Sequence, residues 1–395
     1  MIDAVILVGG KGSRLGPLTK KTPKPLIKIN NQVFLDILLS KILKYNFNKI
    51  YLICSFKKEK FFKIYHNKIL HNSKIICIDE GSPKDTGGAL YKIKKFIKND
   101  FILINGDTYF DIDISRIINT KFKNSICTIA ITKNNNNNLN HKINNIHINK
   151  KKIIQFSKIK TNLMNGGVYF FKKKIFKSII EKKCSLENDI LKRLIEKKKI
   201  HGIYFKEKFI DIGSHKTIKF LKKNKDFLKQ KVIFLDRDGV INRLRNNDYV
   251  KNYNEFKFLP SVSDAISYIK KKNYLVIIIT NQACVGKSII SKKKLNLIHD
   301  KMQKYLKSKN NAHVDDIFFS PYYKYSNNIK YRNNIIDRKP NPGMLIKAIK
   351  KWNIDKKKSF FIGDSLTDYE AAKKIKIKFY YKDKSFLLNQ LKRIL

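Results

Sequence analysis

The sequence has few cysteines and no long apolar run. Its five cysteines lie far apart, and none belongs to a C-x-x-C pair, so we predict neither a disulfide framework nor a cysteine zinc site. No segment approaches the roughly 18 consecutive apolar residues of a membrane-spanning helix, and the first residues do not resemble a signal peptide. We therefore expect a protein of the reducing cytoplasm, with no membrane partner.

Acidic residues are scarce relative to basic ones. The chain has 31 Asp and Glu against 85 Lys and Arg, which gives a formal net charge of +54. The excess is nearly all lysine and is spread over every segment, whereas nucleic-acid-binding proteins gather basic and aromatic residues on one face. We therefore expect no nucleic-acid partner, although a cationic surface attracts anionic substrates such as sugar phosphates and nucleotides.

A length of 395 residues favours two or three domains, and one domain start is visible past the middle of the chain. The apolar run 232–235 is typical of a buried strand in a parallel sheet, and Asp236, Asp238 and Gly239 follow it. Residues i and i+2 of an extended chain share a face, so both carboxylates can lie at the carboxyl edge of the sheet. Two carboxylates there suit Mg²⁺, and one could accept a phosphoryl group as a nucleophile.

The N-terminal end carries a glycine-rich loop directly after another apolar run. Residues 4–8 predict a buried strand, and the segment G-G-K-G-S-R-L at 9–15 follows it. Glycine lets backbone N–H groups approach phosphates closely, and Arg14 and Lys24 can add charged contacts. The loop fits neither the P-loop pattern nor the Rossmann G-x-G-x-x-G pattern.

These motifs resemble the sugar nucleotidyltransferases, which join a nucleoside triphosphate to a sugar 1-phosphate. The chain matches their G-G-x-G-[ST]-R-L-x-P-L-T and P-K-P signature almost throughout, and the likeness covers about residues 1–222. It implies a Rossmann-like three-layer α/β/α domain in which Asp107 and Asp211 hold Mg²⁺, while Arg14 and Lys24 neutralise developing charge. It also implies nucleotide and sugar contacts from a further set of residues: Gly9, Gly10, Gly12, Gly87, Gly88, Asn165, Gly166 and Glu187.

One segment narrows this resemblance. The sequence of the motif Asn105-Gly-Asp-Thr108, together with the short length of the domain, looks most like that of the D-glycero-D-manno-heptose 1-phosphate guanylyltransferases. This likeness alone favours GTP over ATP as the nucleotide.

Four polar strand ends in the C-terminal half follow the order Asp, Thr, Lys, Asp. They are Asp236, Thr280, Lys339 and Asp364, and this order resembles the haloacid-dehalogenase-like phosphatases. In that family the first aspartate attacks phosphorus, and the second, here Asp238, is the general acid and base. The resemblance implies a set of phosphate-binding residues: Thr280, Asn281, Arg338 and Lys339. It also implies an Mg²⁺ site made by Asp236, Asp364 and the Asp238 carbonyl.

The spacing of these motifs indicates a second Rossmann-like α/β/α domain without a cap. About forty residues separate Asp238 from Thr280, which leaves no room for a cap domain. The motifs D-R-D-G-V-I-N, T-N-Q and R-K-P resemble those of the branch that contains the heptose 1,7-bisphosphate and histidinol-phosphate phosphatases. Members of that branch commonly carry a zinc loop of Cys and His before R-K-P. Residues 320–337 contain neither residue type, so we expect no zinc.

A lysine-rich segment from Lys219 to Lys231 separates the two sets of motifs. It contains no glycine or proline, so we predict a helical connector with the boundary near residue 230. The expected domains are a nucleotidyltransferase over residues 1–229 and a phosphatase over residues 230–395, both of the α/β class.

The two expected domains suggest consecutive reactions. Removing the 7-phosphate of D-glycero-D-manno-heptose 1,7-bisphosphate yields a heptose 1-phosphate, which the other domain would activate with a nucleotide. The leading hypothesis is therefore a bifunctional enzyme of nucleotide-activated heptose synthesis for a surface glycan. The enzyme alternative is a hexose 1-phosphate nucleotidyltransferase fused to a histidinol-phosphate-type phosphatase, and the non-enzyme alternative is a basic nucleic-acid-binding or scaffold protein. The sugar anomer and the oligomeric state stay open.

Overall fold

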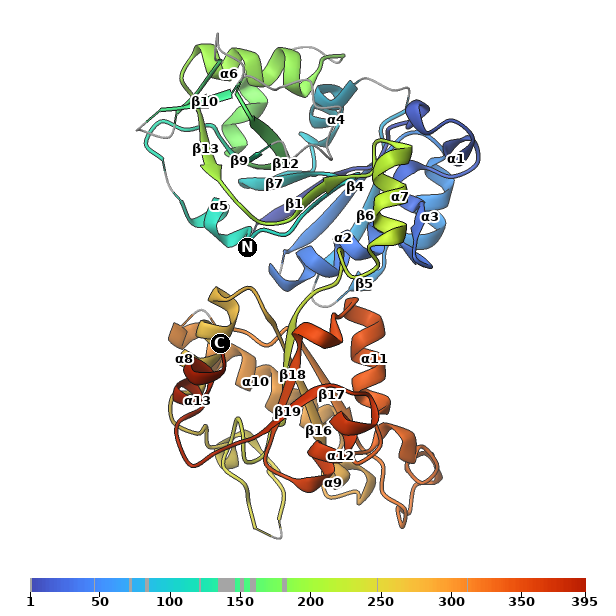
Figure 1. The fold of residues 1–395 in the computed structure, drawn as a ribbon, viewed down its shortest axis with the longest axis vertical. Helices are drawn as coiled ribbons and strands as arrows, with labels where there is room; N and C mark the ends of the chain where they lie inside the picture. Colours follow the sequence, from blue (N-terminus) through green and yellow to red (C-terminus); the bar gives the residue numbers. More distant parts are fainter. Residues whose placement is uncertain are drawn as a thin grey trace. The chain divides into compact units, whose positions relative to one another are not determined.

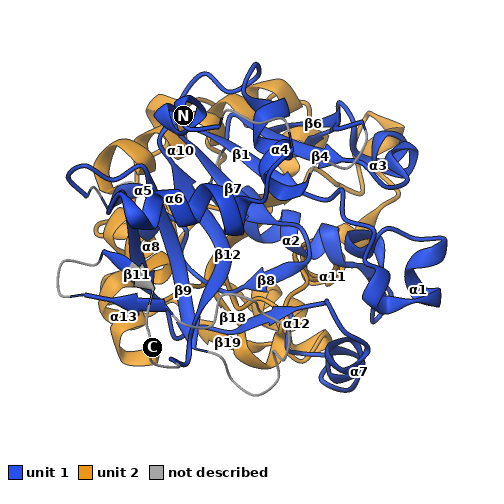
Figure 2. Cartoon of the chain, turned by 90° about the horizontal axis from the view of Figure 1, so that it is seen from above, with its two compact units in different colours: residues 1–228 blue, residues 229–395 orange. Residues whose placement is uncertain are grey.

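The chain forms two compact units, Met1–Leu228 and Lys229–Leu395, which Figure 2 shows in different colours. The structure is a computed structural model. It describes residues 2–45, 47–70, 73–81, 85–120, 122–133, 146–149, 153–156, 161–179, 183–246, 248–310 and 312–395.

The N-terminal unit is built on an eight-stranded sheet of order β13-β9-β12-β7-β1-β4-β6-β5 (Figure 1). Strand β12 runs antiparallel to β7 and β9, and β5 runs antiparallel to β6, while the other neighbours are parallel. The strands are β1 (Asp3–Leu7), β4 (Lys49–Cys54), β5 (Ile69–Leu70), β6 (Ser73–Asp79), β7 (Phe101–Asn105), β9 (Cys127–Lys133), β12 (Leu163–Phe171) and β13 (Ile200–Tyr204).

Alternate residues of these strands face two separate cores. On β1, Val5 packs into one core, and Ala4 and Ile6 pack into the other. The first core is closed by α4 (Asp85–Ile93), the π-helix η5 (Leu186–Leu191) and α6 (Lys192–Glu196). The second is closed by α2 (Phe34–Ile42), α3 (Lys58–Tyr65) and α5 (Ser115–Asn119). The predicted three-layer α/β/α architecture is confirmed for this half.

Shorter elements complete the unit. They are α1 (Pro17–Lys20), α7 (His215–Lys223), β2 (Lys28–Ile29), β3 (Gln32–Val33), β8 (Thr108–Phe110), β10 (Ile146–Ile148), β11 (Ile154–Phe156) and β14 (Phe209–Asp211). Strands β8 and β14 pair antiparallel with Thr108 opposite Asp211. This pairing brings two segments about a hundred residues apart to one place.

The C-terminal unit has a five-stranded, wholly parallel sheet of order β17-β16-β15-β18-β19. Its strands are β15 (Val232–Leu235), β16 (Leu275–Asn281), β17 (Asp316–Ser320), β18 (Phe360–Gly363) and β19 (Lys378–Tyr381). Its helices are α8 (Val262–Lys271), α9 (Ala283–Gly286), α10 (Lys292–Asn310), α11 (Gly343–Trp352), α12 (Leu366–Lys374) and α13 (Leu387–Ile394).

Both faces of this sheet are buried, as continuous apolar runs require. Ile233 and Leu235 of β15 pack with α8, α10 and α13, whereas Val232 and Phe234 pack with α11 and α12. The chain between Asp238 and β16 forms a loop, a short 3-10 turn and α8. The predicted α/β fold without an inserted cap is confirmed.

The prediction of a helical connector is wrong in its second half. Helix α7 ends at Lys223, and the side chain of Asn224 donates to the Phe220 carbonyl at 2.9 Å. Phe227 then folds back edge-on against the ring of Phe220 at 5.4 Å. The backbone of Asn224 has φ −100° and ψ 69°, outside the helical region, so the helix ends there although the following residues favour a helix.

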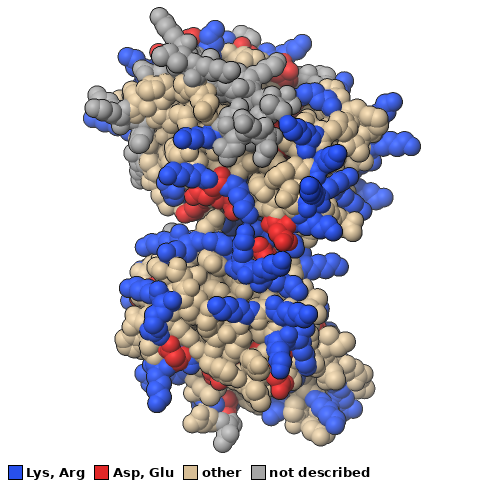
Figure 3. All heavy atoms as spheres, viewed as in Figure 1, with Lys and Arg blue, Asp and Glu red and all other residues tan. Residues whose placement is uncertain are grey.

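Basic side chains and the lengths of the apolar helices bear on two expected partners, nucleic acid and membrane. Among the described residues, no helix is both long and apolar enough to cross a membrane. Figure 3 shows lysine and arginine spread over the visible face of both units, with no single cationic patch.

Candidate active sites

A cavity of about 620 Å³ lies at the carboxyl ends of β1, β4, β6 and β7 in the N-terminal unit. Its walls include the loop after β1 with Gly9, Gly10 and Arg14. An added Cβ on Gly10 would meet no atom within 4 Å, whereas one on Gly9 would lie 3.0 Å from Ser55 Cβ. Gly10 therefore leaves the backbone accessible to a ligand, while Gly9 permits close packing of the loop.

Gly12 shapes this loop without lining the cavity. Its φ is +66°, a conformation that favours glycine, and its carbonyl accepts a hydrogen bond from Thr19 Oγ1 at 3.0 Å. Gly12 therefore fixes the turn that carries Arg14 to the cavity.

Two carboxylates and a lysine meet on one side of the cavity. Lys24 Nζ lies 2.5 Å from Asp107 Oδ2, and only 9% of the Lys24 side chain is exposed. An added Cβ on Gly213 would lie 2.7 Å from Asp211 Oδ1 and 3.4 Å from Lys24 Nζ, so Asp211 is adjacent to this ion pair. Two neighbouring carboxylates that face a polar cavity fit a magnesium site, and Lys24 supplies a positive charge beside it.

The other predicted sugar and nucleotide contacts divide into two groups. Glu187 lines the cavity, and its Oε2 accepts from Thr86 Oγ1 at 2.9 Å. Four residues are not part of the lining and instead build the wall behind it: Gly87, Gly88, Asn165 and Gly166.

Close packing explains why these four residues stand where they do. The N–H groups of Gly87 and Gly88 donate to the Cys184 carbonyl at 2.9 and 3.2 Å. Asn165 Nδ2 donates to Tyr169 Oη at 2.6 Å, and an added Cβ on Gly166 would lie 2.4 Å from the Phe110 ring. Side chains at positions 87 and 166 would push apart the helix and strands that shape the cavity.

The C-terminal unit has a smaller cavity of about 220 Å³ at the carboxyl ends of β15, β16 and β18. Most of the predicted phosphatase residues line it, namely Asp236, Asp238, Thr280, Asn281, Lys339 and Asp364. Arg338 does not. It is half-buried, and its NH1 donates to the Tyr322 carbonyl at 3.1 Å.

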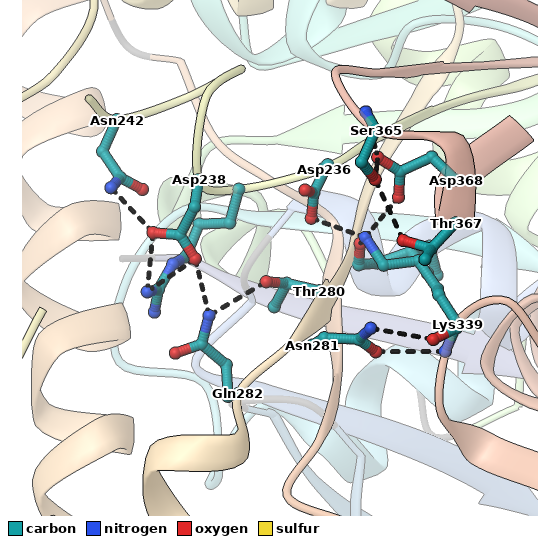
Figure 4. A network of polar contacts seen from close by, with 12 residues as sticks. Asp236, Asp238, Asn242, Thr280, Asn281, Gln282, Lys339, Ser365, Thr367 and Asp368 are labelled. Atoms are coloured by element: carbon teal, nitrogen blue, oxygen red, sulfur yellow. Dashed lines mark hydrogen bonds and ion pairs between the residues drawn. The ribbon is translucent and has the colours of Figure 1, made fainter. Parts of the chain in front are cut away.

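Lys339 is the centre of this second site (Figure 4). Its buried Nζ lies 2.8 Å from Asp236 Oδ1 and pairs also with Asp368 Oδ1. Asn281 holds the backbone of Lys339 through two hydrogen bonds of 3.0 Å. Burial raises the pKa of Asp236 above its usual range, and the charge of Lys339 opposes this rise. The carboxylate and the ammonium are thus fixed side by side.

The carboxylates here can hold a cation. One oxygen each of Asp236, Asp364 and Asp368 lie within 4.8 Å of one another. An added Cβ on Gly239 would stand 1.7 Å from Asp364 Oδ2, so glycine is needed for this approach. Asp368 is already engaged, because Ser365 N and Oγ donate to its Oδ2 at 3.2 and 2.7 Å and Lys339 takes Oδ1. The structure therefore fits Mg²⁺ on Asp236 and Asp364, with Asp368 orienting Lys339.

The carboxylate of Asp238 is fully occupied. Oδ1 accepts from Asn242 Nδ2 at 2.9 Å, Oδ2 accepts from Gln282 Nε2 at 2.8 Å, and NH2 of Arg237 reaches both oxygens (Figure 4 shows the first two). Gln282 Nε2 also donates to Thr280 Oγ1 at 3.0 Å. Burial raises the pKa of Asp238, but the charge of Arg237 and these hydrogen bonds lower it by a larger amount, so the net shift of the pKa is downward.

Comparison with known proteins agrees with this geometry. The family model described as "Nucleotidyl transferase" matches residues 3–230, and that described as "Polynucleotide kinase 3 phosphatase" matches residues 231–391. The D-glycero-alpha-D-manno-heptose 1-phosphate guanylyltransferase of Campylobacter jejuni is 32% identical over 54% of this chain and 95% of its own length. The D-glycero-beta-D-manno-heptose-1,7-bisphosphate 7-phosphatase of Rhodopseudomonas palustris is 39% identical over 35% of this chain and 76% of its own. The chain belongs to the nucleotidyl transferase family through its N-terminal unit. Its C-terminal unit is a haloacid-dehalogenase-like phosphatase domain.

Other relatives match the transferase unit alone. The bifunctional protein GlmU of Methanococcus maripaludis is 34% identical over 223 residues, which are 54% of this chain and 51% of that protein. The chain therefore spans about half the length of this group of curated relatives.

Several residues of the two sites were not predicted from the sequence, among them Asp368, Gln282 and Glu80. Asp368 and Gln282 of the phosphatase unit are engaged with Lys339 and Asp238, and Glu80 lines the transferase cavity. Each follows a buried strand within a few residues. That position at the carboxyl edge was the available signal, but many surface residues share it.

The raised pKa of Asp236 predicts competition between protons and Mg²⁺ in the phosphatase unit. The nucleophile must be ionised, so activity is lost as the pH falls through the pKa of Asp236. Mg²⁺ favours the ionised carboxylate and lowers that pKa. The acid limb of the pH profile of kcat/KM should therefore move to lower pH between limiting and saturating Mg²⁺. Identical acid limbs at both Mg²⁺ concentrations would contradict the binding of protons and Mg²⁺ to the same carboxylate, that of Asp236.

Proposed function

We propose that this chain is a bifunctional enzyme of nucleotide-activated heptose synthesis. Its phosphatase domain, residues 230–395, removes the 7-phosphate from D-glycero-D-manno-heptose 1,7-bisphosphate. Its transferase domain, residues 1–229, then joins a nucleotide, GMP from GTP, to the heptose 1-phosphate. The observation that carries the proposal is the presence in one chain of two polar sites, each in a unit that has a relative named for a reaction of a heptose 1-phosphate or a heptose 1,7-bisphosphate.

The phosphatase residues account for hydrolysis in two steps. The Asp236 carboxylate attacks phosphorus, the bond to the sugar oxygen breaks, and that oxygen takes a proton from the protonated form of Asp238, which is a minor form in the free protein at neutral pH because the pKa of Asp238 is lowered. Water then attacks the aspartyl-phosphate, and Asp238 takes its proton while phosphate leaves. Thr280, Asn281 and Lys339 hold the phosphoryl group, which needs positive charge and hydrogen-bond donors around it. Bound Mg²⁺ supplies further charge neutralisation.

The transferase residues account for direct nucleotidyl transfer. The sugar phosphate attacks the α-phosphorus of the nucleotide in line with the departing pyrophosphate. Arg14 and the backbone of the loop at Gly10 lie where the triphosphate would be held, and Lys24 stands beside Asp107 and Asp211. These groups neutralise charge that develops on the phosphate oxygens, and Mg²⁺ on Asp107 and Asp211 would add to it.

The anomer must be the same for both steps if the product of one is the substrate of the other. The relative of the transferase is named for the α anomer, and that of the phosphatase for the β anomer. We propose the α anomer, because the transferase relative is matched over nearly its whole length.

The cysteines bear on the cell compartment, and residues 320–337 bear on whether zinc is needed. All five cysteines are buried and none is in a disulfide bond, which supports a place in the reducing cytoplasm. We propose that no zinc is needed, since residues 320–337 offer no thiolate or imidazole. The loop is held instead by hydrogen bonds, such as that from the buried Ser326 Oγ to the Gly286 carbonyl.

Synthetic heptose 1,7-bisphosphate tests the proposal. With Mg²⁺, the α anomer should release phosphate, and pyrophosphate should follow only after GTP is added. Turnover of histidinol phosphate in place of either heptose anomer would favour the alternative pair of activities. Phosphate release from the β anomer alone, with transfer to the α anomer alone, would show that the two sites do not act in sequence.

Glu80 should determine the choice of nucleotide. It is 7% exposed and lines the transferase cavity beside Gly9. Its carboxylate can accept from N1–H and the 2-amino group of guanine, whereas adenine offers an acceptor at N1. Glu80→Gln should therefore lower kcat/KM for GTP by roughly 10–100-fold and change that for ATP far less. Asp79→Asn, one residue earlier and outside the cavity, is the matched control. An equal effect of Glu80→Gln on both nucleotides would contradict this role.

A further inference from the structure

Arg237 lies between the two catalytic aspartates, yet its side chain is buried. It is 1% exposed and among the largest fully buried side chains of the protein. Its NH2 donates to both carboxylate oxygens of Asp238 at 2.9 and 3.0 Å, and NH1 lies 3.2 Å from His299 Nε2 of α10. Arg237 therefore connects the proton-transferring carboxylate to the helix layer of the domain.

Stability gives a weak reason for this arrangement. Burying a guanidinium costs free energy that its partners must offset, and Nε of Arg237 has no hydrogen-bond partner among the described residues. The turn that follows is held by its backbone, since Ile241 N and Asn242 N donate to the Arg237 carbonyl at 2.8 and 3.0 Å. An apolar side chain at 237 would leave those backbone bonds in place.

His299 suits the task of holding Arg237. Arginine only donates hydrogen bonds, so Nε2 of His299 must be the acceptor. Burial and the charge of Arg237 lower the pKa of His299 to about 3, so the ring stays neutral. A neutral acceptor fixes NH1 without competing with Asp238 for the positive charge, as a carboxylate at 299 would. The ring of Phe319 contacts His299 edge-on and the Phe256 ring lies near the guanidinium, so both side chains are held by packing.

We propose that Arg237 and His299 are positioning residues of the phosphatase reaction, which fix the carboxylate of Asp238 in one orientation for proton transfer to the leaving group. The inference rests on the proposed phosphatase function. Arg237 makes two of the four hydrogen bonds to this carboxylate and carries the one charge among those donors. Without it, the amides of Asn242 and Gln282 remain, each bound to a different oxygen. A carboxylate held less firmly spends less time where the sugar oxygen needs its proton.

The leaving group provides a test that separates positioning from general damage. A sugar oxygen needs a proton as it departs, whereas p-nitrophenolate departs without one. The ratio kcat/KM includes only the steps through departure of the leaving group, so it isolates this proton transfer. Arg237→Met should lower kcat/KM for the sugar phosphate by roughly 100-fold and that for p-nitrophenyl phosphate by far less, since general acid catalysis contributes on that order.

Substitutions at His299 give an independent check. Gln can accept the hydrogen bond from Arg237 and Leu cannot, so His299→Gln should retain more sugar phosphate turnover than His299→Leu. Arg393→Met, which removes an arginine from an exposed ion pair with Asp383, is the control for loss of an arginine. Thermal unfolding of each variant shows whether it is folded.

The outcomes distinguish this inference from the proposed function. Equal losses on both substrates for Arg237→Met, or equal activities of the two His299 variants, would overturn the positioning role. If Arg237→Met does not fold, the comparison of His299→Gln with His299→Leu tests the positioning role. If the unmodified protein cleaves p-nitrophenyl phosphate but not the heptose bisphosphate, the proposed substrate is wrong. The comparison can then be made with any alkyl phosphate that it cleaves.

Discussion

Both units depend on the burial of a mainly parallel sheet on its two faces. Strands covered by helices on both sides carry mainly apolar side chains along their length, and the carboxyl ends of adjacent parallel strands meet at one edge. Asp236, Thr280 and Asp364 reach that edge in one unit, and Asp107 reaches it in the other. The same constraint thus creates two polar cavities, in which phosphate groups can be held by charged residues that the core could not accept.

The two sites use lysine in related ways. In the phosphatase unit, Lys339 is buried between Asp236 and Asp368, which fixes the ammonium beside the nucleophile. In the transferase unit, Lys24 pairs with Asp107 and adjoins Asp211. In both, a lysine stands beside carboxylates suited to Mg²⁺, so several positive charges can surround one phosphate. The overall excess of lysine, by contrast, is spread over the surface and singles out neither site.

Residues that directly end a buried strand were predictable from the sequence, because the run of apolar residues marks where the strand ends. The fold class was predictable for the same reason. Asp368 was not, since its role depends on how α12 turns it back toward Lys339. Nor was the packing of Gly87 and Gly166, because a glycine motif does not reveal whether a ligand or another part of the chain approaches it. The end of α7 was not predictable either, because it coincides with local contacts that Asn224 and Phe227 make with Phe220.

The independence of the two sites within one chain is tested most directly by Asp236→Asn. The substitution removes the nucleophile and keeps the size of the side chain. Phosphate release from heptose 1,7-bisphosphate should be abolished, while pyrophosphate release from supplied heptose 1-phosphate and GTP should match the unmodified protein. Loss of both activities in a folded variant would contradict two separate sites.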